Sequence, residues 1–319
     1  MNEYEIIETI VGAARRLPPG YSRIGDDVGE VPLKRGKLIV KMDMLVGKSD
    51  VPRGMTYREA ARKSVGMCVS DFASKGVFPD SYLISLGLKE GTTREQVKDL
   101  ALGFADASNE WSVRLVGGDT SEAEDLVINC AMFGFSKRIV RRSGAKPGQM
   151  VVTAGYFGYP ASGLKILQEG ATADRRFYEL AVQSVRRPSP NLLLGVGISA
   201  FLSSAMDSSD GLAISLHTLA RSSAVGIRVT KLPVKKDVVS FASSNGYNAT
   251  DLALYGGEEY VIVGTLDSKR YDEARATAKR FGGELIAIGE TTRAKGRVFL
   301  ETEGRKRVEV EMKGWIHAV

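Results

Sequence analysis

The chain has 319 residues, of which 43% are hydrophobic and 26% charged, a composition typical of a globular protein long enough for two domains. No apolar stretch approaches the roughly 20 residues that span a bilayer, and the acidic start is unlike a signal peptide, so we expect no membrane association. The net charge of +6 is modest and does not by itself predict binding to nucleic acid.

The scarcity of cysteine and histidine narrows the chemistry further. Cys68 and Cys130 form no C-x-x-C pair, which indicates a reducing cytosol rather than a disulfide scaffold. His217 lies in a helix-like segment, and His317 is two residues from the end of the sequence. The sequence therefore offers few ligands for a zinc site and few candidates for a histidine-dependent catalytic triad. Catalysis would have to rest on carboxylates, metal ions, backbone amides and basic side chains.

Strands and helices alternate in the first part of the chain, which predicts an α/β fold. Apolar runs predict strands at residues 37–45, 81–88, 113–116 and 126–136. Helices are predicted at 56–75 and 93–111. The first opens with the capping box Thr56 and Glu59, and the second opens with Thr92, Thr93 and Glu95.

A polar, basic and turn-rich segment at 137–149 interrupts this pattern. We place a domain boundary there, which gives domains at 1–137 and 138–319. The second part has expected strands at 150–154, 226–229 and 261–266 and near the C-terminus. Its expected helices lie at 161–168, 174–186, 212–221 and 268–281, with further helical runs after the turn at 187–190 and before residue 256.

Short acidic motifs, each beside glycine or a small residue, recur along the chain, and most of them lie where an apolar run stops. They are 25–27 (GDD), 42–43 (MD), 69–71 (VSD), 117–120 (GGDT) and 207–211 (DSSDG). Asp beside Gly is ordinary turn chemistry, and for any one motif this is the simpler interpretation. Five motifs in one chain favour a site for a hard cation, because carboxylate oxygens are the ligands that Mg²⁺ prefers. The sequence therefore predicts magnesium held for phosphate chemistry.

The common phosphate-binding signatures are absent. The nearest match to a P-loop, at 158–165, has Leu164 where the lysine belongs. The sequence at 195–200 imitates a dinucleotide fingerprint but follows Pro-Ser-Pro rather than a clear strand. If ATP is bound, a different architecture binds it.

In chain order, a series of motifs resembles the thiamine-monophosphate kinase family, within the superfamily of aminoimidazole ribonucleotide synthetase and selenophosphate synthetase. The motifs are 24–27 (IGDD), Asp43, 70–71 (SD), 117–120 (GGDT), 142–148 (RSGAKPG), 187–190 (RPSP), 207–212 (DSSDGL) and 256–258 (GGE). The resemblance implies two α/β domains with mixed sheets and a homodimer joined through N-terminal strands. It implies transfer of the γ-phosphoryl group of ATP to thiamine monophosphate, with Mg²⁺.

The resemblance also implies roles for individual residues. Metal ligands would be Asp27, Met42 (through its backbone carbonyl), Asp43, Asp71, Asp119, Asp207 and Asp210. Nucleotide contacts would come from Gly117, Gly118, Arg142 and Ser209. Substrate contacts would come from Asp50, Glu258 and Trp315. No residue is expected to act as a covalent or acid–base catalyst, because the attacking phosphate oxygen is already ionised.

The chain departs from the family pattern at several positions. Lys41 and Met42 stand where Ser or Thr is usual, and Asp50 stands where some relatives have a histidine facing the substrate. Arg142 read alone could be a loop charge, and Trp315 could be a core aromatic covering a strand. The alternative functions are a sister enzyme that activates an amide or carbonyl oxygen with ATP, and a non-catalytic nucleotide-binding or nucleic-acid-binding protein.

Overall fold

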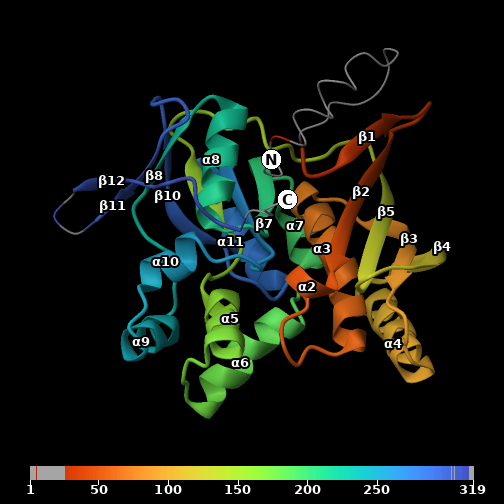
Figure 1. The fold of residues 1–319 in the computed structure, drawn as a ribbon. Coiled ribbons are helices and arrows are strands. Elements are labelled where there is room, and N and C mark those ends of the chain that lie inside the picture. Colours follow the sequence, from red (N-terminus) through yellow and green to blue (C-terminus); the bar gives the residue numbers. More distant parts are fainter. Residues whose placement is uncertain (1–4, 6–25, 303, 305, 316–319) are drawn as a thin grey trace.

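The structure is a computed structural model that describes residues 26–302 together with Glu5, Gly304 and residues 306–315. His317 and the first two residues of the 24–27 motif therefore lie outside the described residues. Within the described part, the strands form two sheets (Figure 1). The first has the order β1-β2-β5-β3-β4 and the second has the order β12-β11-β8-β10-β6-β9-β7.

The first sheet is built from residues that precede the break at 137–149. Its strands are β1 (Gly29–Pro32), β2 (Lys37–Val46), β3 (Pro79–Leu88), β4 (Arg114–Glu122) and β5 (Val127–Ser136). The second sheet follows the break and contains β6 (Met150–Thr153), β7 (Leu202–Ser208), β8 (Gly226–Val229), β9 (Val261–Leu266), β10 (Ile286–Thr292), β11 (Val298–Glu301) and β12 (Arg307–Glu309). The predicted α/β fold with mixed sheets is confirmed, whereas the division into domains at residue 137 remains a prediction.

The two faces of the first sheet have different environments. Alternate residues of β5, such as Cys130 and Met132, are fully buried beneath the helices. On the opposite face Met42, Met44 and Phe135 are 63%, 57% and 62% exposed. The sheet thus has one packed face and one open face with large apolar side chains.

Helix α3 (Tyr57–Lys75) packs against the first sheet and reaches the second (Figure 1). It begins with the predicted capping box of Thr56 and Glu59 and ends at Gly76, whose φ of 70° is left-handed. Helix α7 (Leu192–Ile198) approaches α3 so closely that a Cβ on Gly195 would lie 2.3 Å from the Ala73 carbonyl oxygen. One apolar core consequently joins α3 to α7 and β7.

The described residues contain further helices. They are α2 (Gly47–Asp50), α4 (Arg94–Trp111), α5 (Tyr159–Glu169), α6 (Arg175–Arg186), α8 (Leu212–Ser223), α9 (Lys236–Ser244), α10 (Ala249–Leu254) and α11 (Tyr271–Arg280), with the 3₁₀ turn η1 (Ser268–Arg270). The capping box of α4 pairs Thr93 with Gln96, so Glu95 was the wrong partner. None of the helices in the described residues is long and apolar enough to cross a membrane.

Candidate metal and phosphate site

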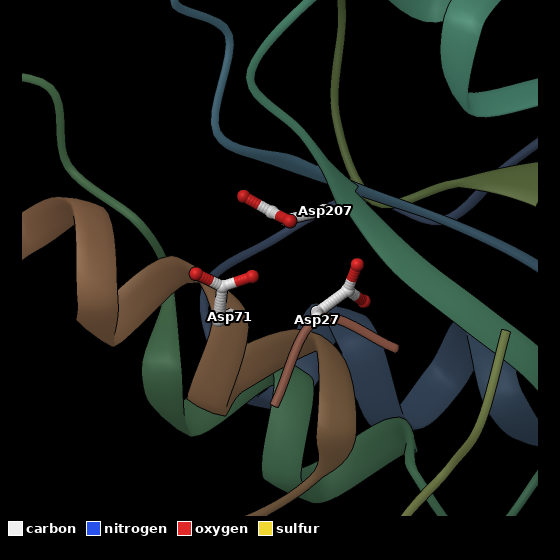
Figure 2. Close-up of side chains that lie close together, drawn as sticks. All are labelled: Asp27, Asp71 and Asp207. Atoms are coloured by element: carbon white, nitrogen blue, oxygen red, sulfur yellow. The ribbon is translucent and has the colours of Figure 1, made fainter. Parts of the chain in front are cut away.

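Three buried carboxylates converge between the two sheets (Figure 2). Asp27 precedes β1, Asp71 lies on α3, and Asp207 lies near the end of β7. Each offers an oxygen, and these oxygens all lie within 4.8 Å of one another. Segments separated by more than 130 residues therefore build one acidic cluster, as the sequence motifs predicted for these three residues.

Serines of α3 orient two of these carboxylates. The Ser70 hydroxyl donates to Asp207 Oδ2 at 2.8 Å, and the Ser74 hydroxyl lies 3.4 Å from Asp27 Oδ2. Ser70 and Ser74 are four residues apart and share one side of the helix, with Asp71 beside them. The helix period thus places a polar stripe of α3 against the end of β7.

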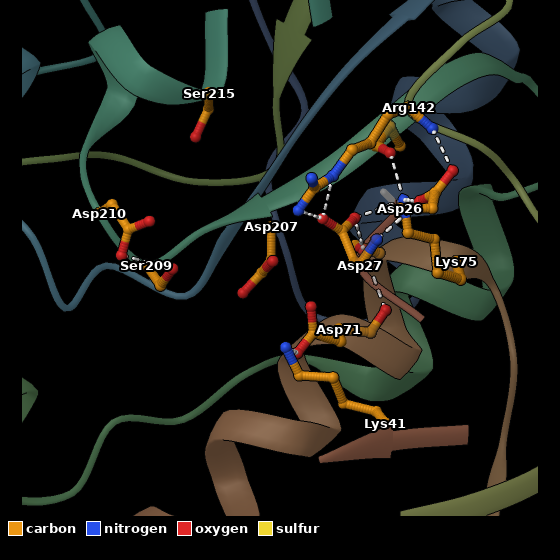
Figure 3. Close-up of polar contacts among 12 residues, drawn as sticks. Asp26, Asp27, Lys41, Asp71, Lys75, Arg142, Asp207, Ser209, Asp210 and Ser215 are labelled. Carbon is orange, nitrogen blue, oxygen red and sulfur yellow. Dashed lines mark hydrogen bonds and ion pairs between the residues drawn. The ribbon is translucent and has the colours of Figure 1, made fainter. Parts of the chain in front are cut away.

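Two cations hold the Asp26–Asp27 end of the cluster (Figure 3). The Lys75 ammonium is fully buried, contacts Asp27, and lies 2.7 Å from both Asp26 Oδ1 and the Ala205 carbonyl oxygen. The guanidinium of Arg142 donates to Asp27 Oδ1 through Nε and Nη2. Burial opposes ionisation of Asp27, but Lys75 and then Arg142 outweigh it and lower its pKa. Asp27 is therefore a carboxylate at neutral pH.

A third cation lies at the other end of the cluster. Lys41 and Asp43 are two residues apart on β2 and so share the face of the sheet that packs against α3. The Lys41 ammonium lies 3.0 Å from Asp43 Oδ1 and 2.9 Å from Asp71 Oδ2. Burial opposes its charge, but Asp43 and Asp71 outweigh this and raise the pKa of Lys41. Asp43 thus joins the cluster through an ion pair.

The negative charges of Asp71 and Asp207, in the middle of the cluster, are only partly balanced by nearby cations. Burial first, and then the charge of Asp207, raise the pKa of Asp71 well above its ordinary value. Burial first, and then the charge of Asp27, raise the pKa of Asp207 to about 6. Both side chains offer only oxygen donors, and a further cation beside them would favour their ionised forms. Such a set of ligands fits a hard divalent ion such as Mg²⁺. Asp71 and Asp207, with Asp27 adjacent, are the residues that would hold it.

A second group of predicted residues lies beside this cluster. Ser209 and Asp210 follow Asp207, and the Ser209 hydroxyl donates to Asp210 Oδ1 at 3.1 Å (Figure 3). The Trp315 amide donates to the Asp210 carbonyl oxygen at 3.0 Å, and its side chain is 49% exposed. About half of Trp315 is thus open to solvent, and whether it contacts a substrate or covers a strand stays a prediction.

Glu258 and Asp50 are joined through a buried lysine. The Lys63 ammonium lies 2.6 Å from Glu258 Oε2 and donates to the Asp50 carbonyl oxygen at 2.9 Å. The Asp50 carboxylate accepts from the Val46 amide at 2.7 Å and from the Ser49 hydroxyl at 3.0 Å. Its side chain therefore stabilises the turn into α2, and its predicted contact with a substrate stays a prediction.

The residues of β4 are not brought to the cluster within one chain. β4 is an edge strand, and Gly117, Gly118 and Asp119 are all exposed. Strand pairing places Asp119 beside Ser85, which is opposite Asn129 on the open face of the sheet. β5 and β3 separate β4 from β2, which is about 14 Å at ~4.8 Å per strand. Met42 also points its side chain to the open face, so its metal contact through the backbone carbonyl remains a prediction.

Several residues of the site were missed by sequence reasoning. Lys63 and Lys75 were read only as part of a helix, although Lys63 lies seven residues before Ser70 and Lys75 lies four residues after Asp71, spacings that place each pair on one side of a helix. Tyr260 is buried, and burial together with nearby carboxylates, Glu258 first among them, raises its pKa well above the ordinary value. Lys41 was noted only as a departure, because nothing in the sequence shows that its ammonium reaches α3.

Comparison with known proteins first defines the class. Residues 25–136 match the family described as "AIR synthase related protein, N-terminal domain". This region contains the first sheet, α3 and the carboxylates Asp27, Asp43 and Asp71. The first sheet and α3 are therefore those of the AIR-synthase-related class, whereas Asp207 of the acidic cluster lies outside the matched residues.

Longer matches define the family within this class. A thiamine-monophosphate kinase of Nitrosopumilus maritimus (strain SCM1) is 38% identical over 292 residues, which are 92% of each chain. One from Pyrococcus abyssi (strain GE5 / Orsay) is 33% identical over 319 residues and covers 99% of this chain and 96% of its own. A solved structure described as "AaThiL complexed with AMPPCP and TMP" has a TM-score of 0.87 at 28% identity, with 99% and 97% of the two chains covered. The chain belongs to the thiamine-monophosphate kinase family, which confirms the resemblance seen in the sequence.

Proposed function

We propose that this protein transfers the γ-phosphoryl group of ATP to thiamine monophosphate, giving thiamine diphosphate and ADP. The observation that carries the proposal is the buried cluster of Asp27, Asp71 and Asp207 with Arg142 at its edge, in a chain related over nine-tenths of its length to thiamine-monophosphate kinases. Bound Mg²⁺ would neutralise phosphate charge and align the two reacting groups.

The described side chains suit a reaction that depends on positioning. The nucleophile is a phosphate oxygen that is ionised at neutral pH, so it needs no base. His217 is buried, and its Nε2 lies 2.8 Å from the Val310 carbonyl oxygen, so we assign it no role as a base. Arg142 uses Nε and Nη2 on Asp27, and its guanidinium has further N–H donors for a phosphate oxygen. It would add positive charge where the transferred group carries negative charge.

The substrate contacts belong to the same proposal. Trp315 is half exposed next to Asp210, so its indole would cover the flat, cationic thiamine. Glu258 is held by Lys63 on the same side, where its carboxylate would face the thiamine. The two cysteines are free and buried, which supports a reducing cytosol as the compartment.

A homodimer completes the proposed site. The open face of the first sheet exposes Met42, Met44 and Phe135, and all of β4 is exposed along the sheet edge. A single chain rarely leaves a sheet edge and an apolar face of this kind uncovered. Asp119 points from this face, so it would act on the phosphates of the partner chain rather than of its own. Pairing of the first sheets across a two-fold axis would cover the face and bring Asp119 to a site.

A direct assay tests the reaction. Protein is incubated with ATP, Mg²⁺ and thiamine monophosphate, and thiamine phosphates and ADP are separated and quantified. Thiamine diphosphate and ADP should form in equal amounts. The Asp207→Asn variant should lose on the order of a hundredfold or more in rate, because it removes a charge from the metal site. ATP turnover with free thiamine or with an amide acceptor, but none with thiamine monophosphate, would reject the proposal.

A further inference from the structure

Lys41 connects two elements of the acidic cluster. It lies on β2, whereas its two partners are Asp43 on the same strand and Asp71 on α3. The two N···O distances, 3.0 and 2.9 Å, are those of ordinary charge-assisted hydrogen bonds. In Figure 3 the ammonium lies directly beside the Asp71 carboxylate. One nitrogen therefore bridges carboxylates from two elements, which is a position that a metal ion can also take.

The charges around Lys41 show what its removal would leave. Lys75 and Arg142 contact Asp26 and Asp27, and neither is in contact with Asp43 or Asp71 among the described ion pairs. Among the same described ion pairs, Lys41 contacts both Asp43 and Asp71. A neutral side chain at this position would leave two neighbouring carboxylates without a cation between them. Carboxylate pairs of this kind bind a divalent ion or a proton.

We propose that the Lys41 ammonium is a built-in cation that replaces one divalent ion at the Asp43–Asp71 end of the site. The protein then binds one metal ion fewer than the same chain with a neutral residue at position 41. The remaining ion is held at the Asp71–Asp207 end, where no lysine or arginine contacts Asp207 in the described residues. This inference rests on the proposed magnesium site, but its test counts bound metal and requires no turnover.

The experiment counts Mn²⁺ bound per chain in the absence of nucleotide. Lys41→Met removes the charge and keeps much of the length of the side chain, whereas Lys41→Arg keeps the charge. Lys37→Met is the matched control, because Lys37 lies on the same strand and the same face but pairs with Glu30, away from the cluster. Each protein is purified in Mn²⁺, separated from free ion by gel filtration and analysed by elemental analysis. Titration followed by electron paramagnetic resonance gives the number of sites.

The expected result is one more Mn²⁺ per chain in Lys41→Met than in the unmodified protein, with unchanged numbers in Lys41→Arg and Lys37→Met. Lys41→Thr provides a second neutral variant if Lys41→Met does not fold, and it should gain the same additional ion. An equal number of sites in the neutral variants, even with tighter binding, would overturn the inference, because Lys41 would then only compete for an existing site. If no form binds Mn²⁺, the proposed metal site fails as well.

Discussion

The buried lysine of α3 provides a direct test of how the cluster is stabilised. The Lys75 side chain is fully buried, and its ammonium contacts Asp26, Asp27 and the Ala205 carbonyl oxygen. Lys75→Met keeps the apolar stem but removes the ammonium that contacts these two carboxylates and this carbonyl oxygen. Breaking a buried ion pair from one side costs about 3–5 kcal/mol, and an unsatisfied acceptor adds to this. We expect the free energy of unfolding to fall by about 4 kcal/mol.

The measurement is urea unfolding at pH 7 without added metal, followed by circular dichroism. At an m-value on the order of 3 kcal/mol/M, the midpoint should fall by more than about 1 M. Lys98→Met, an exposed lysine on α4, is the control and should leave the midpoint unchanged. Adding Asp26→Asn to Lys75→Met should cost less than the two single changes together, because they share one interaction. A loss below 1 kcal/mol for Lys75→Met would refute the reasoning.

The effect should also depend on pH in a defined direction. Burial opposes ionisation of Asp27, but Lys75 and Arg142 lower its folded-state pKa below the unfolded value of 3.8. Its ion pairs therefore contribute stability above that value, and this contribution is lost as the pH falls through the folded-state pKa. The difference between the unmodified protein and Lys75→Met should thus be largest near neutral pH and should shrink in acid.

Two further predictions concern the site. Asp119→Asn should fold normally and lose on the order of a hundredfold or more in rate. Mixing this variant with Asp207→Asn after reversible dissociation should restore part of the activity, because one of the two sites in a mixed dimer would be intact. No recovery of activity in verified mixed dimers would contradict the action of Asp119 across the interface. Trp315→Ala should raise the KM for thiamine monophosphate several-fold and leave that for ATP nearly unchanged. An unchanged KM with a lowered melting temperature would instead assign Trp315 a structural role.

Much of the fold could be predicted because local signals agreed with the final structure. The capping box of Thr56 and Glu59 predicted where α3 begins, and the helix starts there in the structure. β7 was missed because it is rich in serine, including Ser203, Ser204 and Ser208, and lacks a continuous apolar run. β4 was expected to stop at residue 116, but it continues through the glycines to Glu122 because pairing with β3 outweighs their weak strand preference.

The site could be predicted only in part. The acidic residues carry a recognisable motif, and the structure brings Asp27, Asp71 and Asp207 together as the sequence suggested. The cations that balance them do not form a motif, because a lysine on a strand or helix is usually solvated. That Lys41 meets Asp71 depends on how β2 packs on α3, and this is a property of the tertiary structure. The face of Asp119 similarly depends on the register of β4 against β3.

The close contact of α7 with α3 has a consequence for truncated forms of the protein. The apolar core runs from α3 into α7 and β7 and includes Leu194, Ile198 and Ala205. A fragment that ends after β5 would expose the side of α3 around Ala73 and would leave Lys75 without its carbonyl partner on β7. We therefore expect the isolated first part to aggregate when expressed alone, and the two parts to lose structure in a single cooperative step on heating.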